Sequence, residues 1–241
     1  MSHLDKDAGK VAGMFDGIAR RYDLVNHLLS GGVDFLWRRL AVRLSGAKKG
    51  DVVLDMCCGT GDLGFCFAKN SEAGKVVGCD FSGEMVRLAR LKEEKLAKNG
   101  KFGDTEFEWA TSDCTATSYA DDSYDIISCG FGVRNMADLD SGLKEMHRLL
   151  KKGGRVCIIE FTLPENAVFR TVYLLYLRYI LPIFGGIITG KLSAYRYFAD
   201  SIVKWDKEVD LGRSLEAAGL EKVTIRSLSK GIAAIYVFGK A

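Results

Sequence analysis

Short apolar runs alternate with longer amphipathic stretches along the chain from residue 51 onward. Such runs, bounded by glycine or polar residues, are typical of strands buried on both faces of a sheet. The predicted strands span residues 52–54, 76–79, 107–110, 126–129 and 156–161. Helical spacing of apolar residues is clearest at 62–70, 83–98 and 138–151. The glycine pair at 153–154 predicts a turn. Strands that alternate with helices predict a mostly parallel sheet covered on both faces.

The two ends of the chain depart from this alternation. A predicted helix over residues 208–218 is followed by apolar runs at 222–228 and 232–238, which predict a hairpin. Residues 11–45 have helical spacing, broken by Gly31 and Gly32 before a second helix at 35–44. The fold class expected is therefore α/β: one Rossmann-like domain with a seven-stranded, mostly parallel sheet and a terminal antiparallel hairpin. Residues 1–45 and 165–205 lie outside this body, as a predicted lid and a predicted helical cap.

Composition narrows the class of protein. A hydrophobic share of 48% over 241 residues is enough for a buried core. A net charge of +3 is too small to indicate nucleic-acid binding by itself. The seven cysteines form no CxxC pair and only three histidines are present, so we expect no metal site. Residues 1–13 lack the apolar core of a signal peptide, which favours a cytosolic protein with reduced thiols. A mitochondrial matrix protein without its transit peptide stays open.

Excess positive charge is concentrated in two segments. Residues 1–50 contain nine Lys or Arg and five Asp, and residues 165–205 contain five Lys or Arg and two acids. Residues 166–188 are also strongly apolar, but Arg170, Arg178 and Pro182 argue against a membrane-spanning helix. Together these features predict reversible contact with an anionic membrane surface. Chance surface composition and a core helix of the cap are the simpler alternatives.

A glycine-rich turn follows the first predicted strand, in the sequence DMCCGTGDL at residues 55–63. Asp55 closes the strand, and Gly59, Thr60 and Gly61 lead into a helix whose first N–H groups are unpaired. Glycine at these positions lets the chain turn sharply and lets a ligand approach the backbone. A Gly-x-Gly turn alone is weak evidence, because many such matches are only tight turns.

Two further acids strengthen the case for a nucleotide cofactor. Asp80 ends the second strand, where a carboxylate can accept hydrogen bonds from ribose hydroxyls. Asp113, with Cys114 beside it, follows the third strand and is placed to accept from an adenine amino group. Since the carboxyl ends of parallel strands meet at one edge of the sheet, Asp55, Asp80 and Asp113 should face the same ligand.

The identity of that cofactor depends on charge. Gly64 formally completes a G-x-G-x-x-G pattern, so NAD has to be considered. A pyrophosphate favours a loop without carboxylates, however, and Asp55 and Asp62 flank this turn. A sulfonium compound with a free amino group is attracted by both acids. S-adenosylmethionine is therefore favoured, with an NAD-dependent oxidoreductase as the alternative.

The motif at 55–63 resembles the first motif of the ubiquinone/menaquinone biosynthesis C-methyltransferase family. Three other segments are similar to that family: FDGIARRYDLVN at 15–26 with its continuation to Trp37-Arg38, FGVRN at 131–135 and SAYRYFADSI at 193–202. The first motif is shared by many methyltransferases, whereas the segments at 15–38 and 131–135 are much more specific. The resemblance implies a class I fold and S-adenosylmethionine-dependent C-methylation of a prenylated quinol precursor, of the demethylmenaquinol or ubiquinol-precursor type.

Catalytic candidates come from these specific segments. Arg134 and Asn135 follow the fourth strand, where an arginine beside a phenol oxygen would favour the reactive phenolate. Tyr22, with Asn26 near it, is a candidate lid residue that closes on the acceptor ring. The simpler interpretations are a salt bridge for Arg134, a helix cap for Asn135 and core packing for Tyr22. Glu160 ends the fifth strand and is expected either at the site or in a salt bridge with Arg196.

Other functions stay open on sequence grounds. A divergent segment at 185–194 allows a methyltransferase for another small phenolic or lipophilic acceptor. Gly130 replaces a serine that touches the cofactor in the family, which allows a non-catalytic S-adenosylmethionine-binding subunit of a biosynthetic complex. The expected partners are a lipophilic quinol, no nucleic acid, and either a second copy or a complex partner. The expected location is the cytoplasm, in peripheral contact with the inner membrane face.

Overall fold

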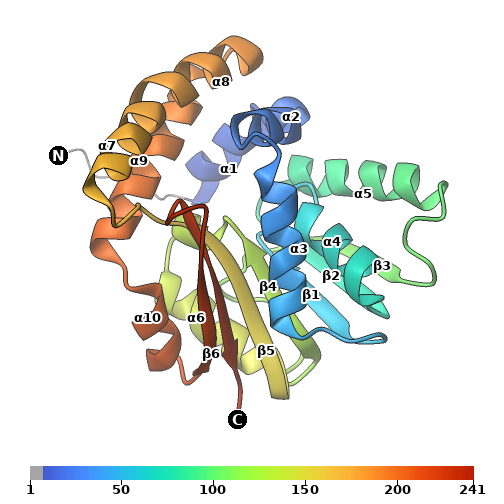
Figure 1. Cartoon of the computed structure of the whole chain (residues 1–241). Helices are drawn as coiled ribbons and strands as arrows, with labels where there is room; N and C mark the ends of the chain where they lie inside the picture. Colours follow the sequence, from blue (N-terminus) through green and yellow to red (C-terminus); the bar gives the residue numbers. More distant parts are fainter. Residues whose placement is uncertain (1–7) are drawn as a thin grey trace.

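The computed structural model describes residues 8–241 and contains one seven-stranded sheet (Figure 1). Its strands follow the order β3-β2-β1-β4-β5-β7-β6. Their bounds are β1 Val52–Met56, β2 Lys75–Asp80, β3 Glu106–Thr111, β4 Tyr124–Gly130, β5 Leu150–Phe161, β6 Glu221–Leu228 and β7 Ala233–Gly239. The pairs among β1 to β5 are parallel, and β7 lies antiparallel between β5 and β6. The predicted fold class is confirmed.

Helices cover both faces of this sheet because side chains alternate along each strand. In β1, Val53 packs against one face together with α3 (Val33–Ser45) and α4 (Asp62–Ser71). Leu54 and Met56 pack against the other face with α6 (Leu139–Leu149) and α10 (Leu211–Ala217). The central strands β1 and β2 are therefore mostly apolar and buried, whereas the edge strands β3 and β6 carry exposed polar side chains along their length.

Three boundaries differ from the sequence prediction. The N-terminal segment forms three helices, α1 Ala8–Asp16, α2 Ala19–Leu29 and α3, because the chain also breaks at Gly17. The predicted turn at 153–154 lies inside β5, where Gly153 has φ +74° and the register with β4 shifts. The single helix expected at 208–218 is interrupted, because Asp210 caps α10 by accepting from the backbone N–H of Arg213.

A third hydrophobic core lies above the carboxyl edge of the sheet. The cap consists of one helical run, α7 Ala167–Leu175, a π-helical turn Tyr176–Ile180 and α8 Leu181–Thr189, followed by α9 Leu192–Glu208. Its buried side chains meet those of the N-terminal helices, and the shared core contains Ile18, Val25, Leu163, Tyr173, Leu177, Leu181, Ala194, Tyr195, Ala199 and Ile202. The helix α5 (Gly83–Ala97), which follows β2, flanks α1 and α2. The helices outside the sheet therefore roof its functional edge.

Close packing of α8 on α9 generates a first prediction. A Cβ at Gly185 would lie 2.5 Å from the ring of Tyr195, so Gly185→Ala forces the two helices apart. We expect a loss of about 1–3 kcal/mol in the free energy of unfolding, the usual cost of overpacking. Urea unfolding measures it. The matched control is Gly83→Ala, where the new methyl group meets only Thr111 Oγ1 at 3.7 Å. Equal stability of the two variants would contradict this account of the cap.

Candidate active site

The loop between β1 and α4 depends on glycine conformations. Gly59 has φ +55° and Gly61 has φ +84°, a region that side chains strain to adopt. A Cβ at Gly61 would also lie 2.7 Å from the indole of Trp109. Above Gly59, by contrast, an added Cβ meets no atom of the described chain within 4 Å. The loop is therefore packed on its inner side and open on its outer side, as a ligand-binding turn requires.

Two acids from neighbouring strand ends hold this loop. Asp80 accepts hydrogen bonds from the backbone N–H groups of Gly59 at 2.8 Å and Ser82 at 2.9 Å. Asp55 accepts from the N–H of Gly64 at 2.9 Å and from the hydroxyl of Ser128 at 2.7 Å. Burial raises the pKa of Asp55 to about 7 and that of Asp80 to about 6. Each carboxylate has lone pairs to spare, so both can still accept from a ligand.

The remaining predicted cofactor residues lie in different surroundings. Thr60 is a buried residue of the loop, and its hydroxyl donates to Asp23 of α2. Asp113 is exposed and accepts from the backbone and side chain of Thr115. Cys114 is buried beneath the loop, where its sulfur accepts from the N–H of Cys57 at 3.3 Å. The predicted adenine contacts of Asp113 and Cys114 therefore stay predictions.

A cavity of about 520 Å³ opens from this loop toward the cap. At the loop it is lined by Asp55, Cys57, Cys58, Gly59, Thr60, Asp62 and Leu63. On the opposite side it is lined by aromatic and aliphatic side chains of the cap, which are Phe169, Val172, Tyr173, Tyr176, Leu177, Leu181, Tyr195 and Phe198. Its two ends thus differ in chemistry, since one has carboxylates and peptide groups and the other is almost wholly apolar.

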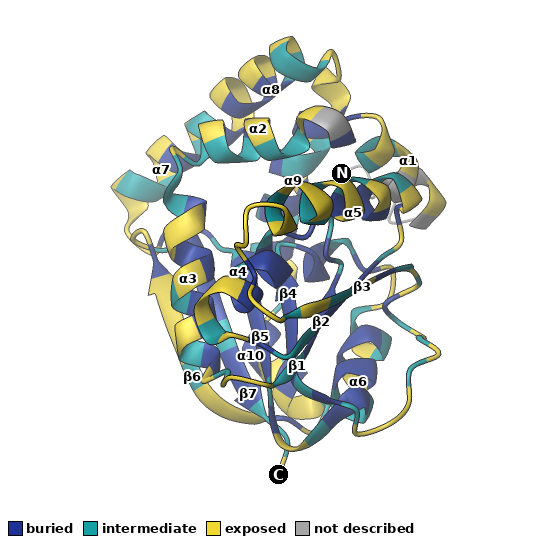
Figure 2. Cartoon of the chain, turned by 90° about the vertical axis from the view of Figure 1, so that its right-hand side faces the viewer, coloured by how far each residue is buried: buried dark blue, intermediate teal, exposed yellow. Residues whose placement is uncertain are grey.

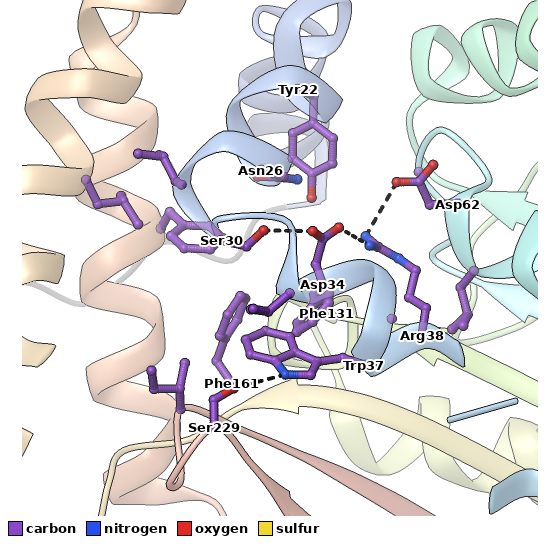
Figure 3. A pocket seen from close by; sticks show the side chains of 18 of the residues that line it. Tyr22, Asn26, Ser30, Asp34, Trp37, Arg38, Asp62, Phe131, Phe161 and Ser229 are labelled. Carbon is purple, nitrogen blue, oxygen red and sulfur yellow. Dashed lines mark hydrogen bonds and ion pairs between the residues drawn. The ribbon is translucent and has the colours of Figure 1, made fainter. Parts of the chain in front are cut away.

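A charged cluster forms the polar wall of this cavity, and of its members only Asp62 is among the residues that the sequence predicts for the site (Figure 3). The Asp34 carboxylate accepts from Ser30 and from His27, each at 2.7 Å, and pairs with Arg38. Arg38 also approaches Asp62 at 3.5 Å, as does His27. The hydrogen bonds and the Arg38 charge hold the pKa of Asp34 below its usual value, against the effect of burial.

The same cluster extends to α5 and closes the roof of the site. Lys92 pairs with Asp62 at the start of α4 and with Asp23 of α2, the latter at 2.7 Å. His27, Asp34 and Asp62 bring three potential metal ligands within 4.8 Å of one another. Arg38 and Lys92 already neutralise their carboxylates, so this cluster favours a structural role over binding a cation.

The three predicted catalytic residues are brought together around a second, much smaller hollow. Tyr22, Arg134 and Asn135 all line it, and Tyr22 lines the main cavity as well. In Figure 3 the Tyr22 hydroxyl points toward Asn26 and the Asp34–Arg38 pair. Burial raises the pKa of Tyr22, and the charge of Arg134 partly offsets that rise. The buried Oδ1 atom of Asn135 has no hydrogen-bond partner among the described residues.

Arg134 does not line the main cavity, because its guanidinium is held by other groups. It pairs with Glu160 at 2.8 Å, and both side chains are almost completely buried. It also stacks between the rings of Phe161 and Phe198, at 5.3 and 4.9 Å from their centroids. The alternative partner expected for Glu160, Arg196, is instead exposed. Direct contact between Arg134 and a substrate oxygen therefore stays a prediction.

The donor and acceptor set at the loop fits S-adenosylmethionine. The carboxylates of Asp55 and Asp62 line the cavity beside the open face of Gly59, and they suit an ammonium or a sulfonium rather than a phosphate. Asp80 stands at the next strand end, within the same loop network, where ribose hydroxyls are expected. The sheet order, the reversed last strand and this loop together define a class I methyltransferase.

Comparison with known proteins identifies the family. Residues 3–240 match the model of the ubiE/COQ5 methyltransferase family, and the chain belongs to that family. It is 38% identical to the ubiquinone/menaquinone biosynthesis C-methyltransferase UbiE of Geotalea daltonii, with 98% of each chain covered. It is also 38% identical to the demethylmenaquinone methyltransferase of Thermus thermophilus, covering 93% of this chain and 98% of that one. The predicted class, an S-adenosylmethionine-dependent methyltransferase, is confirmed.

Solved structures agree on the fold. A SAM-dependent methyltransferase from Aquifex aeolicus has a TM-score of 0.59 at 19% identity, covering 85% of this chain and 89% of that chain. The [4+2]-cyclase SpnF has a TM-score of 0.64 at 15% identity, covering 95% and 94%. A cyclase on the same architecture shows that the fold alone does not determine the chemistry.

The placement of Asp80 generates a second prediction. Asp80→Ala should weaken S-adenosylmethionine binding by about 1.5–3 kcal/mol, because hydrogen bonds to a charged group are lost. In the wild type, affinity should rise as the pH increases through about 6–7, because Asp80 and Asp55 then ionise and become better acceptors for a cationic ligand. Calorimetric titration across this pH range measures both effects.

The control for this titration is Asp104→Ala, which removes an exposed carboxylate from a loop that does not line the cavity. Its affinity should equal that of the wild type at every pH. Unfolding curves of all three proteins establish that each is folded at the temperature of the titration. Undiminished binding by Asp80→Ala would remove Asp80 from the cofactor site.

Proposed function

We propose that the protein methylates a ring carbon of a prenylated quinol precursor of ubiquinone or menaquinone, with S-adenosylmethionine as methyl donor. The observation that carries the proposal is the continuous cavity from the glycine loop to the apolar cap. Two relatives, named for quinone biosynthesis and for demethylmenaquinone, support the same acceptor class. Cytoplasmic location belongs to this proposal and rests on the sequence features alone.

The shape of the cavity suits an acceptor with a polar ring and an apolar tail. The ring would lie near Tyr22 and Asp34, where hydroxyl groups find donors and acceptors. The tail would follow Tyr173, Leu177 and the neighbouring cap residues, which have few polar atoms to offer. Pockets that combine a few placed polar groups with apolar walls bind and orient such ligands.

Residues of this chain would prepare the ring for attack. When bound, S-adenosylmethionine supplies an electrophilic methyl group. Tyr22 is protonated at neutral pH, since its ordinary pKa is near 10 and burial raises it further, so its hydroxyl would donate a hydrogen bond to a ring oxygen. Arg134 lines the smaller hollow beside Tyr22 and, although paired with Glu160, partly offsets the rise in the pKa of Tyr22. The same charge would favour the ionised form of an acceptor phenol held against Tyr22. Phe131 and Phe161 pack against each other in the cavity wall, with ring centroids 4.4 Å apart, and would help exclude water.

The third prediction tests the acceptor. Purified protein with S-adenosylmethionine should add one methyl group to demethylated quinols, which mass spectrometry detects. Phe169→Ala should raise the KM for a long-chain acceptor about tenfold, since an apolar wall is lost, and leave kcat for a short-chain acceptor unchanged. Val223→Ala on the exposed edge strand β6 is the control. If the protein binds S-adenosylmethionine but methylates none of the quinols, the proposal is wrong, and the protein either uses a different acceptor or has a non-catalytic role.

The fourth prediction concerns Arg134. Arg134→Ala leaves Glu160 buried without its partner, and we expect it to cost about 3–5 kcal/mol of stability. It should also lower turnover about a hundredfold or more, while cofactor affinity changes little. Single-turnover methyl transfer at saturating cofactor measures this loss.

Stability and catalysis are separated by the double variant Arg134→Met/Glu160→Gln, which removes both buried charges. This variant should recover most of the stability, because no unpaired charge is left in the core. Its turnover should stay low, because the positive charge beside Tyr22 is missing. Turnover within about threefold of the wild type would instead make the ion pair purely structural.

A further inference from the structure

We call the helical run Ala167–Thr189, which comprises α7, the π-helical turn and α8, the cap helix. One face of the cap helix exposes a continuous row of large apolar side chains. They recur at intervals of three or four residues, so they lie along one side of the helix, at Val168, Val172, Leu175, Tyr179, Ile183 and Ile187. Ile180 and Phe184 widen the row. Soluble monomers seldom expose a contiguous apolar surface of this extent unless it binds something.

A second exposed apolar group lies on the N-terminal helices, at Leu24 and Leu28 of α2 and at Phe35 and Leu36 of α3. The two groups lie on neighbouring helices, because α2 contacts the cap helix at two points. Arg21 donates to the carbonyl of Ile188, and the Tyr176 hydroxyl donates to the carbonyl of Leu29 at 2.8 Å. We call the two groups together the apolar rim. Figure 2 shows the exposed residues of α2, α7 and α8 at one end of the molecule.

The apolar rim borders the opening of the main cavity. Val172 is 56% exposed and also lines the cavity, so the cavity reaches the surface at this side chain. Val33 on α3 and Ser229 and Ile232 in the β6–β7 turn line the cavity as well. An apolar molecule at the rim could therefore enter the cavity without crossing a polar surface.

The two segments that carry the apolar rim contain more basic than acidic residues. Residues 166–189 contain no Asp or Glu, and in residues 24–49 the only acid is the buried and paired Asp34. Four exposed arginines belong to the same helices as the apolar side chains, and they are Arg21, Arg39, Arg43 and Arg178. Exposed Glu165, directly before the helix, and Asp23, which is paired with Lys92, are the acids that border these segments in the sequence. Apolar side chains accompanied mainly by cations match the chemistry of an anionic phospholipid surface.

We propose that the apolar rim docks on an anionic phospholipid bilayer, with the cap helix lying in the plane of the interface and the cavity opening toward the lipid. That a lipophilic acceptor enters the cavity from the lipid rests on the proposed function, whereas the docking itself does not. The helix Ala167–Thr189 is long and apolar enough to span a membrane, with a mean hydropathy of 1.6. Its opposite face, however, packs on the rest of the protein through Tyr173, Leu177 and Gly185. Only one side is left for lipid.

The experiment is flotation of the full chain with vesicles, without any acceptor. The wild type should float with vesicles of phosphatidylglycerol and phosphatidylcholine, and less with phosphatidylcholine alone. About 1 M salt, where the screening length is about 3 Å, should weaken the binding. Val168→Ser/Ile187→Ser should lower the partition coefficient about tenfold or more, because neither side chain lines the cavity and both are 75% exposed. Val223→Ser on β6 is the matched control and should bind as the wild type does.

The remaining outcomes separate this proposal from its rivals. No flotation of the wild type, or equal flotation of the double variant, overturns it. Resistance to alkaline carbonate extraction would indicate a spanning helix and also overturn it. So would a stable dimer in sedimentation velocity that Val168→Ser/Ile187→Ser dissociates, because a second copy would then cover the rim. The double variant should keep wild-type turnover on a short-chain quinol. Vesicle binding without any methyl transfer would leave docking standing and remove the proposed function.

Discussion

The ion-pair cluster centred on Asp62 is the interaction on which the site depends. Asp62 begins α4, directly after the glycine loop, and it is approached by Arg38 from α3 and Lys92 from α5. Lys92 also binds Asp23 of α2, which accepts from Thr60 in the loop. The helices that roof the sheet edge are thereby tied to the turn that carries the cofactor motif. Without this cluster the sheet would still form, but the cavity would lose one wall.

The sheet and the cofactor loop could be predicted because their signals are local. A run such as Val52–Leu54 is apolar for the same reason that it becomes a buried strand, and Gly59 and Gly61 stand where the backbone needs positive φ. The walls of the site could not be predicted, because the residues that contact one another there are far apart in the sequence. Nothing near Arg134 indicates that Glu160, twenty-six residues later, will neutralise it. Likewise, the ordinary sequence position of Asp34 does not reveal that Ser30, His27 and Arg38 converge on it.

The architecture divides general and particular tasks between two layers. The sheet is shared with distant proteins that include a cyclase, so it supplies a platform and a strand edge rather than a reaction. The cap and the N-terminal helices supply the cavity wall, and they hold a core of their own around Tyr173, Leu177 and Tyr195. Changes in acceptor preference can accumulate there without disturbing the packing of the sheet.

The raised pKa values of the loop carboxyls Asp55 and Asp80 have a consequence for the energetics of ligand binding. Because burial raises the pKa of Asp55 to about 7 and of Asp80 to about 6, part of the population holds a proton at one of these groups near neutral pH. A cationic ligand favours the ionised forms and so displaces those protons into the solvent. The heat of binding then includes the ionisation enthalpy of the buffer. Calorimetry in two buffers of different ionisation enthalpy would therefore count the protons released for each ligand bound.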